Sequence, residues 1–186
     1  GAHRTMEFTR MTGEVVKRMR ECPMPIIAAV NGVAAGAGAV LALAADFRLL
    51  AQSASFEFLF TKVGLAGADM GSAYLLPRLI GLSRGTKLLL LGDAISAEEA
   101  EAMGLGDVVD DAELAARSRE LASRLASGPA MAYATTKMLL ARELDMNLAA
   151  ALELEAMAQA LLMTSEDHHE FYRAFTEGRD PKWTGR

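Results

Sequence analysis

The chain has 186 residues, a formal net charge of −5 at neutral pH and 52% hydrophobic residues. This length suits one ordinary globular domain, and long aliphatic side chains recur often enough to form a core. Charges of both signs are scattered without a basic stripe, which argues against a nucleic-acid-binding protein. The single cysteine, Cys22, excludes an internal disulfide and fits a reducing compartment, where we expect it to be a small buried hydrophobe.

The longest apolar stretch, residues 26–45, is long enough for a membrane span. It consists mostly of Ala and Gly, however, and Asn31-Gly32 divides it with a strong turn signal. It therefore predicts a strand over residues 26–30 that is buried on both faces, a tight turn, and a helix of small residues that ends near Ala45. The first residues lack the basic and apolar regions of a signal peptide, so we expect a soluble, cytoplasmic protein.

Before this stretch, the spacing of apolar residues predicts a helix over residues 5–20. One face of that helix carries Phe8, Met11, Val15 and Met19. After it, strands are predicted at 46–51 and 55–58, and the order strand, helix, strand indicates a parallel βαβ unit. A Gly-rich loop over residues 64–71 leads to helices at 72–80 and 84–91.

Ser96 and Glu99 form a predicted capping box at the start of a short helix that ends at Gly104, before a strand at 105–109. From Asp111 onward the pattern is helical, with helices predicted at 130–143, 147–163 and 166–177. The sequence thus predicts an α/β core over residues 1–110 and a helical region over 111–186. The apolar faces of the later helices are broad, which fits either contact with another subunit or a helix central to its own core.

Four blocks together resemble the crotonase, or enoyl-CoA hydratase/isomerase, superfamily. The signature run is residues 25–38 (PIIAAVNGVAAGAG). Residues 75–81 (LLPRLIG), 91–105 (LGDAISAEEAEAMGL) and 166–183, with Phe175, Pro181 and Trp183, agree in order and spacing. The resemblance covers nearly the whole chain. It implies a crotonase-type spiral of βαβ units with a C-terminal α-helical trimerisation region, in trimers often paired into hexamers.

The resemblance also implies an earlier segment, which carries the first strands and a loop that supplies one of two oxyanion-hole amides. We expect that the sequence begins just after that loop and that the chain is a fragment. The second oxyanion donor is, by the family match, the backbone amide of Ala37. Fixed N–H donors aimed at a thioester oxygen stabilise an enolate, and Gly36 and Gly38 allow the ligand to approach the backbone closely. The following helix N-terminus adds positive partial charge.

Two other interpretations of the Gly36-Ala37-Gly38 turn remain. A dinucleotide-binding phosphate loop would require a third glycine at position 41, which is Leu41, and an acidic residue at the end of a second strand. Close packing of a small-residue helix would be the default without the long flanking match.

Hydratases of the family use two glutamates as acid and base, and the matching positions here are Val40 and Phe60. This favours a reaction other than ordinary hydration. Asp69 lies where dienoyl-CoA isomerases and chlorobenzoyl-CoA dehalogenases place a catalytic aspartate, if one inserted residue is allowed. A carboxylate in this apolar loop could transfer a proton or attack a carbon. The alternative role of Asp69 is N-cap of the following helix.

By the resemblance, Phe175 matches the family's coenzyme A-contacting Phe, whereas Gly178 stands where the family has a phosphate-binding Lys. Arg179 or Lys182 could meet a phosphate instead, although solvation is the ordinary role of a surface cation. Coenzyme A would be part of the substrate, so no separate cofactor is expected, and no Cys/His/carboxylate cluster indicates a metal.

The leading hypothesis is therefore an acyl-CoA enzyme that forms an enolate, is closer to an isomerase than to an ordinary hydratase, and uses Ala37 and Asp69 in catalysis. Gly36, Gly38, Val40, Phe60 and Phe175 would contact the substrate. A non-catalytic acyl-CoA-binding or structural homologue and a hydratase with atypical residues are the alternatives. The expected partners are an acyl-CoA thioester and further copies of the chain in a homotrimer or hexamer.

Overall fold

The computed structural model describes all residues, 1–186, and separates into two compact units. Unit 1 contains residues 1–20 and 26–120, and unit 2 contains residues 21–25 and 121–186. The predicted division into a spiral core, residues 1–110, and a helical trimerisation region, residues 111–186, stays a prediction. No single helix has the length and apolar composition to cross a membrane. Two successive helices, α8 (Leu148–Met163) and α9 (Glu166–Glu177), pass such a test only when they are counted together, and the chain bends by 62° between them.

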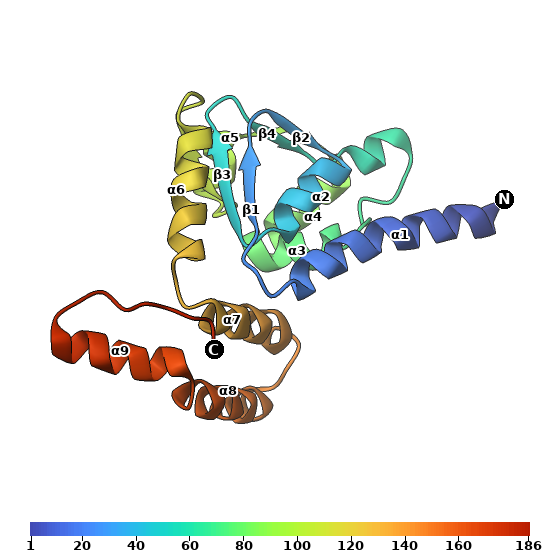
Figure 1. The fold of residues 1–186 in the computed structure, drawn as a ribbon. Coiled ribbons are helices and arrows are strands. Elements are labelled where there is room, and N and C mark those ends of the chain that lie inside the picture. The colour runs from blue at the N-terminus through green and yellow to red at the C-terminus, as the bar shows by residue number, and fades with distance from the viewer. The chain divides into compact units, whose positions relative to one another are not determined.

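Unit 1 is a mixed α/β structure with two small sheets (Figure 1). Its strands are β1 (Ile27–Val30), β2 (Val33–Ala35), β3 (Phe47–Ala51), β4 (Ser55–Glu57), β5 (Ile95–Ser96) and β6 (Asp107–Val109). Its helices are α1 (Ala2–Glu21), α2 (Ala37–Ala44), the 3-10 helix η1 (Leu59–Val63), α3 (Ser72–Ile80), α4 (Leu82–Leu91), α5 (Ala97–Ala102) and the first part of α6 (Leu114–Ala126).

One sheet has the order β1-β3-β6 and is parallel, with Ile27 opposite Phe47 and Leu49 opposite Asp107. The other has the order β2-β4-β5, in which β2 and β4 are parallel and β5 is antiparallel. The predicted parallel βαβ unit is confirmed by β1, α2 and β3. The chain additionally changes sheet at the turn after Val30, so that β2 lies between β1 and α2 in sequence.

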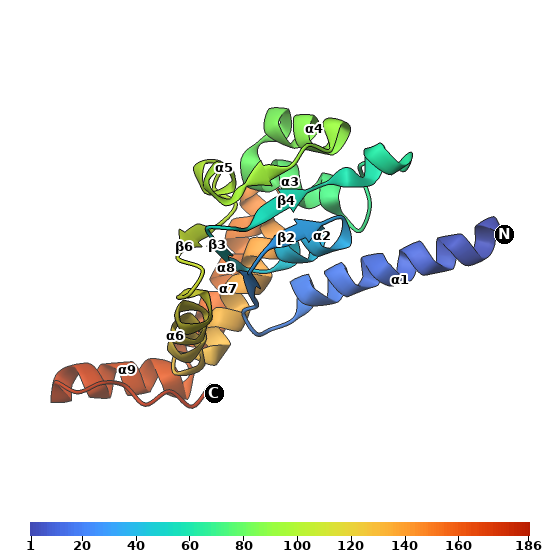
Figure 2. The same cartoon turned by 90° about the horizontal axis from the view of Figure 1, so that it is seen from above.

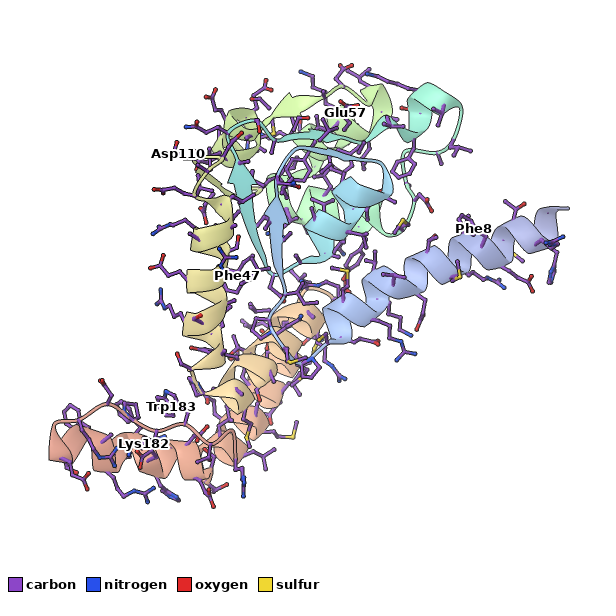
Figure 3. The ribbon with its side chains drawn as sticks, turned by 45° about the horizontal axis from the view of Figure 1, so that its top comes forward. Phe8, Phe47, Glu57, Asp110, Lys182 and Trp183 are labelled. Atoms are coloured by element: carbon purple, nitrogen blue, oxygen red, sulfur yellow. The ribbon has the colours of Figure 1, made fainter.

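One burial prediction for unit 1 is wrong, and the helix predicted at the N-terminus buries only part of its apolar face. Strand β1 is not buried on both faces, because only Val30 is buried, whereas Ile27 and Ala28 are partly exposed and Ala29 is exposed. On α1, Phe8 is 60% exposed and Met11 is 59% exposed, whereas Val16 is buried and Met19 packs beside it. Figures 1 and 2 show the reason: the N-terminal half of α1 extends beyond the rest of unit 1, and Phe8 lies on that projecting part in Figure 3.

The predicted capping box is confirmed at the start of α5. The Ser96 hydroxyl accepts the Glu99 amide at 3.1 Å, and the Glu99 carboxylate accepts the Ser96 amide at 2.8 Å. These reciprocal bonds satisfy donors that have no partner within the helix, which fixes where α5 begins.

Unit 2 is helical and contains the end of α6, α7 (Ala130–Glu143), α8 (Leu148–Met163) and α9 (Glu166–Glu177). Asn147 caps α8 by accepting the Ala150 amide, and Ser165 caps α9 by accepting the His168 amide. The last residues return along α9, where Lys182 and Trp183 are labelled in Figure 3. Two buried carboxylates hold this return: Asp167 accepts the amides of Thr184 and Gly185, and Glu170 accepts the amide of Lys182.

Candidate functional site

The N-terminus of α2 has free backbone donors. Gly36 is its N-cap with φ 51° and ψ −117°, and no side chain caps the helix. The Gly36 amide donates to the Glu57 carbonyl at 2.8 Å, whereas the amides of Ala37, Gly38 and Ala39 in the first turn have no backbone acceptor. Ala37 and Gly38 are exposed, so their two amides, with the positive end of the helix dipole, are open to a ligand, whereas Ala39 is fully buried.

Glycine is required at position 36 for its conformation, because side chains with a Cβ rarely adopt this positive φ. The chain reaches it directly from β2, whose partner β4 provides the Glu57 carbonyl. The free amides are therefore fixed by the β2–β4 pair on one side and by α2 on the other.

A buried apolar cluster lies beside this turn. It consists of Val16, Val40, Ala44, Phe60 and Met70. The Phe60 ring lies 3.9 Å from the position that a Cβ on Gly36 would occupy, so the turn and the cluster adjoin. The structure thus brings together three of the predicted site positions, Gly36, Val40 and Phe60. Neither Val40 (0% exposed) nor Phe60 (8% exposed) provides a titratable group.

The loop that carries Asp69 is fixed at two points. At Gly67, an added Cβ would lie 2.1 Å from the Leu89 carbonyl oxygen, so only glycine fits. The fully buried Ser72 hydroxyl donates to the Gly67 carbonyl at 2.9 Å and accepts the Asp69 amide at 3.0 Å. The backbone on both sides of Asp69 is therefore held without using its carboxylate.

The alternative role of Asp69 as N-cap is wrong, because α3 begins after Gly71 and has no side-chain cap. The Asp69 side chain is partly exposed and its carboxylate has no hydrogen bond or ion pair. The next residue, Met70, is the one non-glycine residue with positive φ, at 52°. Such strain concentrates at functional sites, and here it turns the Met70 side chain into the cluster with Val40 and Phe60.

A profile of the family described as "Enoyl-CoA hydratase/isomerase" matches residues 3–186. The chain belongs to the enoyl-CoA hydratase/isomerase family. It is 44% identical over 173 residues to the "Probable enoyl-CoA hydratase" of Rhodobacter capsulatus, covering 92% of this chain and 67% of that protein. It is 41% identical over 182 residues to the "1,2-epoxyphenylacetyl-CoA isomerase" of Escherichia coli K12, covering 97% and 69%.

Solved structures agree with this membership. A Streptomyces coelicolor A3(2) protein described as an enoyl-CoA hydratase superimposes with a TM-score of 0.98 at 60% identity, over 100% of this chain and 68% of that one. An enoyl-CoA hydratase of Bacillus anthracis gives a TM-score of 0.95 at 32% identity, over 100% and 72%. The chain spans about two thirds of the length of these relatives. The predicted crotonase-type α/β fold is confirmed.

The residues that the family resemblance assigns to coenzyme A lie in unit 2. Phe175 is 75% exposed and stacks on Phe171, with ring centroids 6.2 Å apart. The Arg179 guanidinium is bonded to Glu170 at 2.6 Å and to Glu177, so it is already occupied by carboxylates. The Lys182 side chain is exposed and has no partner, which makes it the freer of the two cations.

Two members of the apolar cluster, Val16 and Met70, are not among the site residues predicted from the sequence. Val16 is adjacent to the predicted apolar face of α1, and only the packed structure shows which side of that face is buried. Met70 gives no turn signal, because a positive φ is typical of Gly, Asn or Asp. The Gly residue that follows it was the one available indication of an unusual backbone.

Proposed function

We propose that the protein is an acyl-CoA enzyme that forms a thioester enolate and shifts a double bond, with Asp69 as its acid-base group. One observation carries this proposal. The buried cluster beside the free amides of α2 is apolar at Val40 and Phe60, whereas the adjoining loop carries one carboxylate without a partner, Asp69. Hydration in this family uses two acid-base carboxylates, but isomerisation needs only one group that removes a proton and returns it.

In the proposed step, the Asp69 carboxylate removes a proton from a carbon made acidic by the thioester carbonyl. The C–H electron pair moves into the conjugated system, and the carbonyl oxygen becomes an enolate oxygen. The Ala37 amide and the α2 N-terminus stabilise that negative charge. Asp69 then returns the proton to a different carbon, so the double bond moves, Asp69 is again ionised, and no water is consumed.

The names of two relatives support isomerisation. The 41% identical Escherichia coli protein is named an isomerase of an epoxyphenylacetyl-CoA, and a 31% identical Streptococcus mutans protein is named a trans-2-decenoyl-[acyl-carrier-protein] isomerase. The substrate we propose is an acyl-CoA thioester, with the turn at Gly36 and Gly38 at its carbonyl. Val40 and Phe60, which are 0% and 8% exposed, would support the acyl site from behind. A contact between Phe175 and coenzyme A stays a separate prediction from the resemblance. No further cofactor enters this proposal.

We propose further that the protein acts in the cytoplasm as a homotrimer or hexamer. Unit 2 supports assembly because it exposes many large apolar side chains, including Leu148 at 74% and Leu161 at 72%. Apolar surface of this kind marks interaction sites.

The test is proton exchange by the full-length protein in deuterated water, with a panel of enoyl- and dienoyl-CoA thioesters and mass spectrometry as readout. We expect exchange into the acyl group, reduced about 10²–10⁴-fold in Asp69→Asn. The matched control is Glu57→Gln, which removes another partly exposed and unpaired carboxylate of unit 1. Loss of exchange in Glu57→Gln but not in Asp69→Asn would assign the role to Glu57 and refute the proposal.

Two other results would select the alternatives. Thioester binding without exchange would indicate a non-catalytic acyl-CoA-binding homologue. Net addition of water to an enoyl-CoA, without movement of the double bond, would indicate hydration. The hydratase names of the Rhodobacter relative and of a 39% identical Thauera aromatica "(E)-benzylidenesuccinyl-CoA hydratase" are the reason to include this assay.

A further inference from the structure

Side chains contact the backbone of helix α2 only at its C-terminal end, and these side chains come from other elements. Its eight residues are all Ala, Gly, Val or Leu, with no acidic residue in the first turn and no basic residue in the last. An α-helix leaves its last four carbonyl groups without intrahelical partners. Because α2 is mostly buried, these carbonyls need donors from elsewhere in unit 1.

Arg48, the second residue of β3, supplies a donor group close to several of these carbonyls. Its Nη1 donates to the Ala45 carbonyl at 2.6 Å and also lies 3.4 Å from the carbonyl oxygens of Ala42 and Leu43. Its Nε donates to the Leu105 carbonyl, which ties the guanidinium to the segment before β6. One planar group therefore joins the end of α2 to two further parts of unit 1.

Arg20, from the end of α1, adds a second donor. Its Nη1 lies 3.4 Å from the Ala44 carbonyl oxygen and 3.2 Å from Asp46 Oδ1, while Asp46 Oδ2 accepts the Ile26 amide at 2.8 Å. The Arg20 and Asp46 side chains are only 27% and 17% exposed. Together, the two arginines approach the carbonyls of all four residues from 42 to 45.

The charges around this end of the helix are two arginines and two aspartates. Burial is the main cause that lowers the pKa of Arg48, followed by the charge of Arg20, while Asp46 and Asp107 act in the opposite direction. Asp107 is exposed and forms no ion pair with Arg48, so solvent screens it. The partly buried positive charges thus lie directly on the negative end of the helix dipole.

We propose that Arg48, assisted by Arg20, is a positioning residue for the enolate site. It fixes α2 along its axis and raises the positive potential at the free amides of Ala37 and Gly38. The helix is about 12 Å long, from 1.5 Å per residue, so a shift at one end moves the amides at the other. This inference rests on the proposed function, because that function places the free amides at a thioester oxygen.

The test uses the full-length protein with bound [1-¹³C]hexanoyl-CoA, whose labelled carbonyl stretch in infrared difference spectra reports polarisation at the oxygen. In Arg48→Gln we expect the carbonyl stretch to move to higher frequency, and the exchange rate at saturating thioester to fall roughly tenfold with KM nearly unchanged. Arg48→Lys retains the charge and should recover part of both effects. Arg117→Gln changes net charge equally on exposed α6 and should change neither.

Asp46→Asn provides a test with the opposite sign. It removes a negative charge near the end of α2 and keeps one acceptor oxygen, so the carbonyl stretch should move to lower frequency. Arg20→Gln should move the carbonyl stretch to higher frequency. The Arg20 side chain is 27% exposed, so this variant tests the inference if Arg48→Gln does not fold. A purely structural cap would lower stability in all of these variants and leave the carbonyl frequency unchanged, which would refute the inference.

The readouts separate this inference from the proposed function. If hexanoyl-CoA binds but no thioester exchanges, the proposed function fails, and the carbonyl frequencies still decide the role of Arg48. If exchange is normal and the frequencies do not depend on Arg48, Arg20 or Asp46, only the positioning role fails. If the wild-type protein binds no thioester, both are refuted.

Discussion

The two units of the protein are stabilised in different ways. Unit 1 encloses large apolar side chains completely, among them Phe56, Leu50 and Leu105, each 0% exposed. In unit 2 every buried apolar residue is an alanine, and its other buried side chains are charged: Lys137, Asp167 and Glu170. Unit 1 therefore has a core of its own, whereas unit 2 depends on hydrogen bonds to a few buried charges.

This difference makes unit 2 the part of the chain on which the proposed assembly would depend. A helical unit that exposes several leucines, and whose only buried apolar residues are alanines, gains little from hydrophobic burial by itself. The site in unit 1, by contrast, is built on a packed cluster that can maintain strained backbone at Gly36 and Met70.

The sharpest test of the comparison is a pair of truncations. Phe56→Ala in unit 1 should lower the free energy of unfolding by about 3–5 kcal/mol, because it leaves a cavity in a closed core. Leu161→Ala on α8, at a side chain 72% exposed, should change the chain's own stability by less than about 0.5 kcal/mol. Urea denaturation measures both, and analytical ultracentrifugation should show weaker assembly for Leu161→Ala. Equal stability losses would contradict the comparison.

A pair of glycine substitutions tests how firmly the unit 1 core imposes strain. Gly36→Ala should destabilise the protein by about 1–3 kcal/mol, because its φ of 51° is unfavourable for a Cβ. Gly38→Ala has open space around the new Cβ and no positive φ, so we expect a change of less than about 1 kcal/mol. Thermal unfolding followed by circular dichroism compares them. A harmless Gly36→Ala would show that the turn can relax.

Acid should act on unit 2 through the segment after α9. The hydrogen bonds from Arg179, then the Lys182 amide, lower the pKa of Glu170 to about 2 from 4.5. A depressed pKa means that this stabilisation is complete above about pH 4.5 and is lost as pH falls towards 2. Trp183, the one tryptophan, lies on this segment, so its fluorescence should report release over that range. In Glu170→Gln this acid-dependent change should be absent.

The smallest effect we predict concerns a pair of carboxyl groups on α7 and α8. Burial, then the charge of Glu155 and a hydrogen bond to it, raises the pKa of Glu143 above its usual 4.5. A raised pKa means that its stabilisation is present at acid pH and is lost as pH rises through the folded-state value. Glu143→Gln should therefore raise the melting temperature at pH 7.5 by a few degrees, with a smaller gain at pH 4. A lower melting temperature at pH 7.5 would contradict this assignment.

Local signals predicted much of the fold. Helices α3, α7 and α9 begin and end at the predicted residues, and the Ser96–Glu99 box fixes α5. Each of these rests on residues within a few positions of one another, where propensity and capping decide the structure. The parallel pairing of β1 with β3 also followed, because a helix connects them.

Other features depend on contacts distant in sequence. The periodicity of α1 gave a face, but it could not show that Phe8 lies on a projecting end while Val16 meets the core. Strand β2 has only three residues, too few for a periodic pattern. The two arginines at the end of α2 come from different elements, and their acceptors are backbone carbonyls, which no side-chain motif reveals.

The Ser72 hydroxyl holds the loop on both sides of Asp69 and leaves that side chain unconstrained by any bond of its own. The backbone of the loop is therefore held independently of the carboxylate that we propose as the acid-base group. A different residue at position 69 would inherit the same anchorage, with the same buried hydroxyl and the same glycine against α4. If Asp69 has the proposed role, evolution could change the reaction at this position by one substitution, because the fold that holds the loop would not have to change.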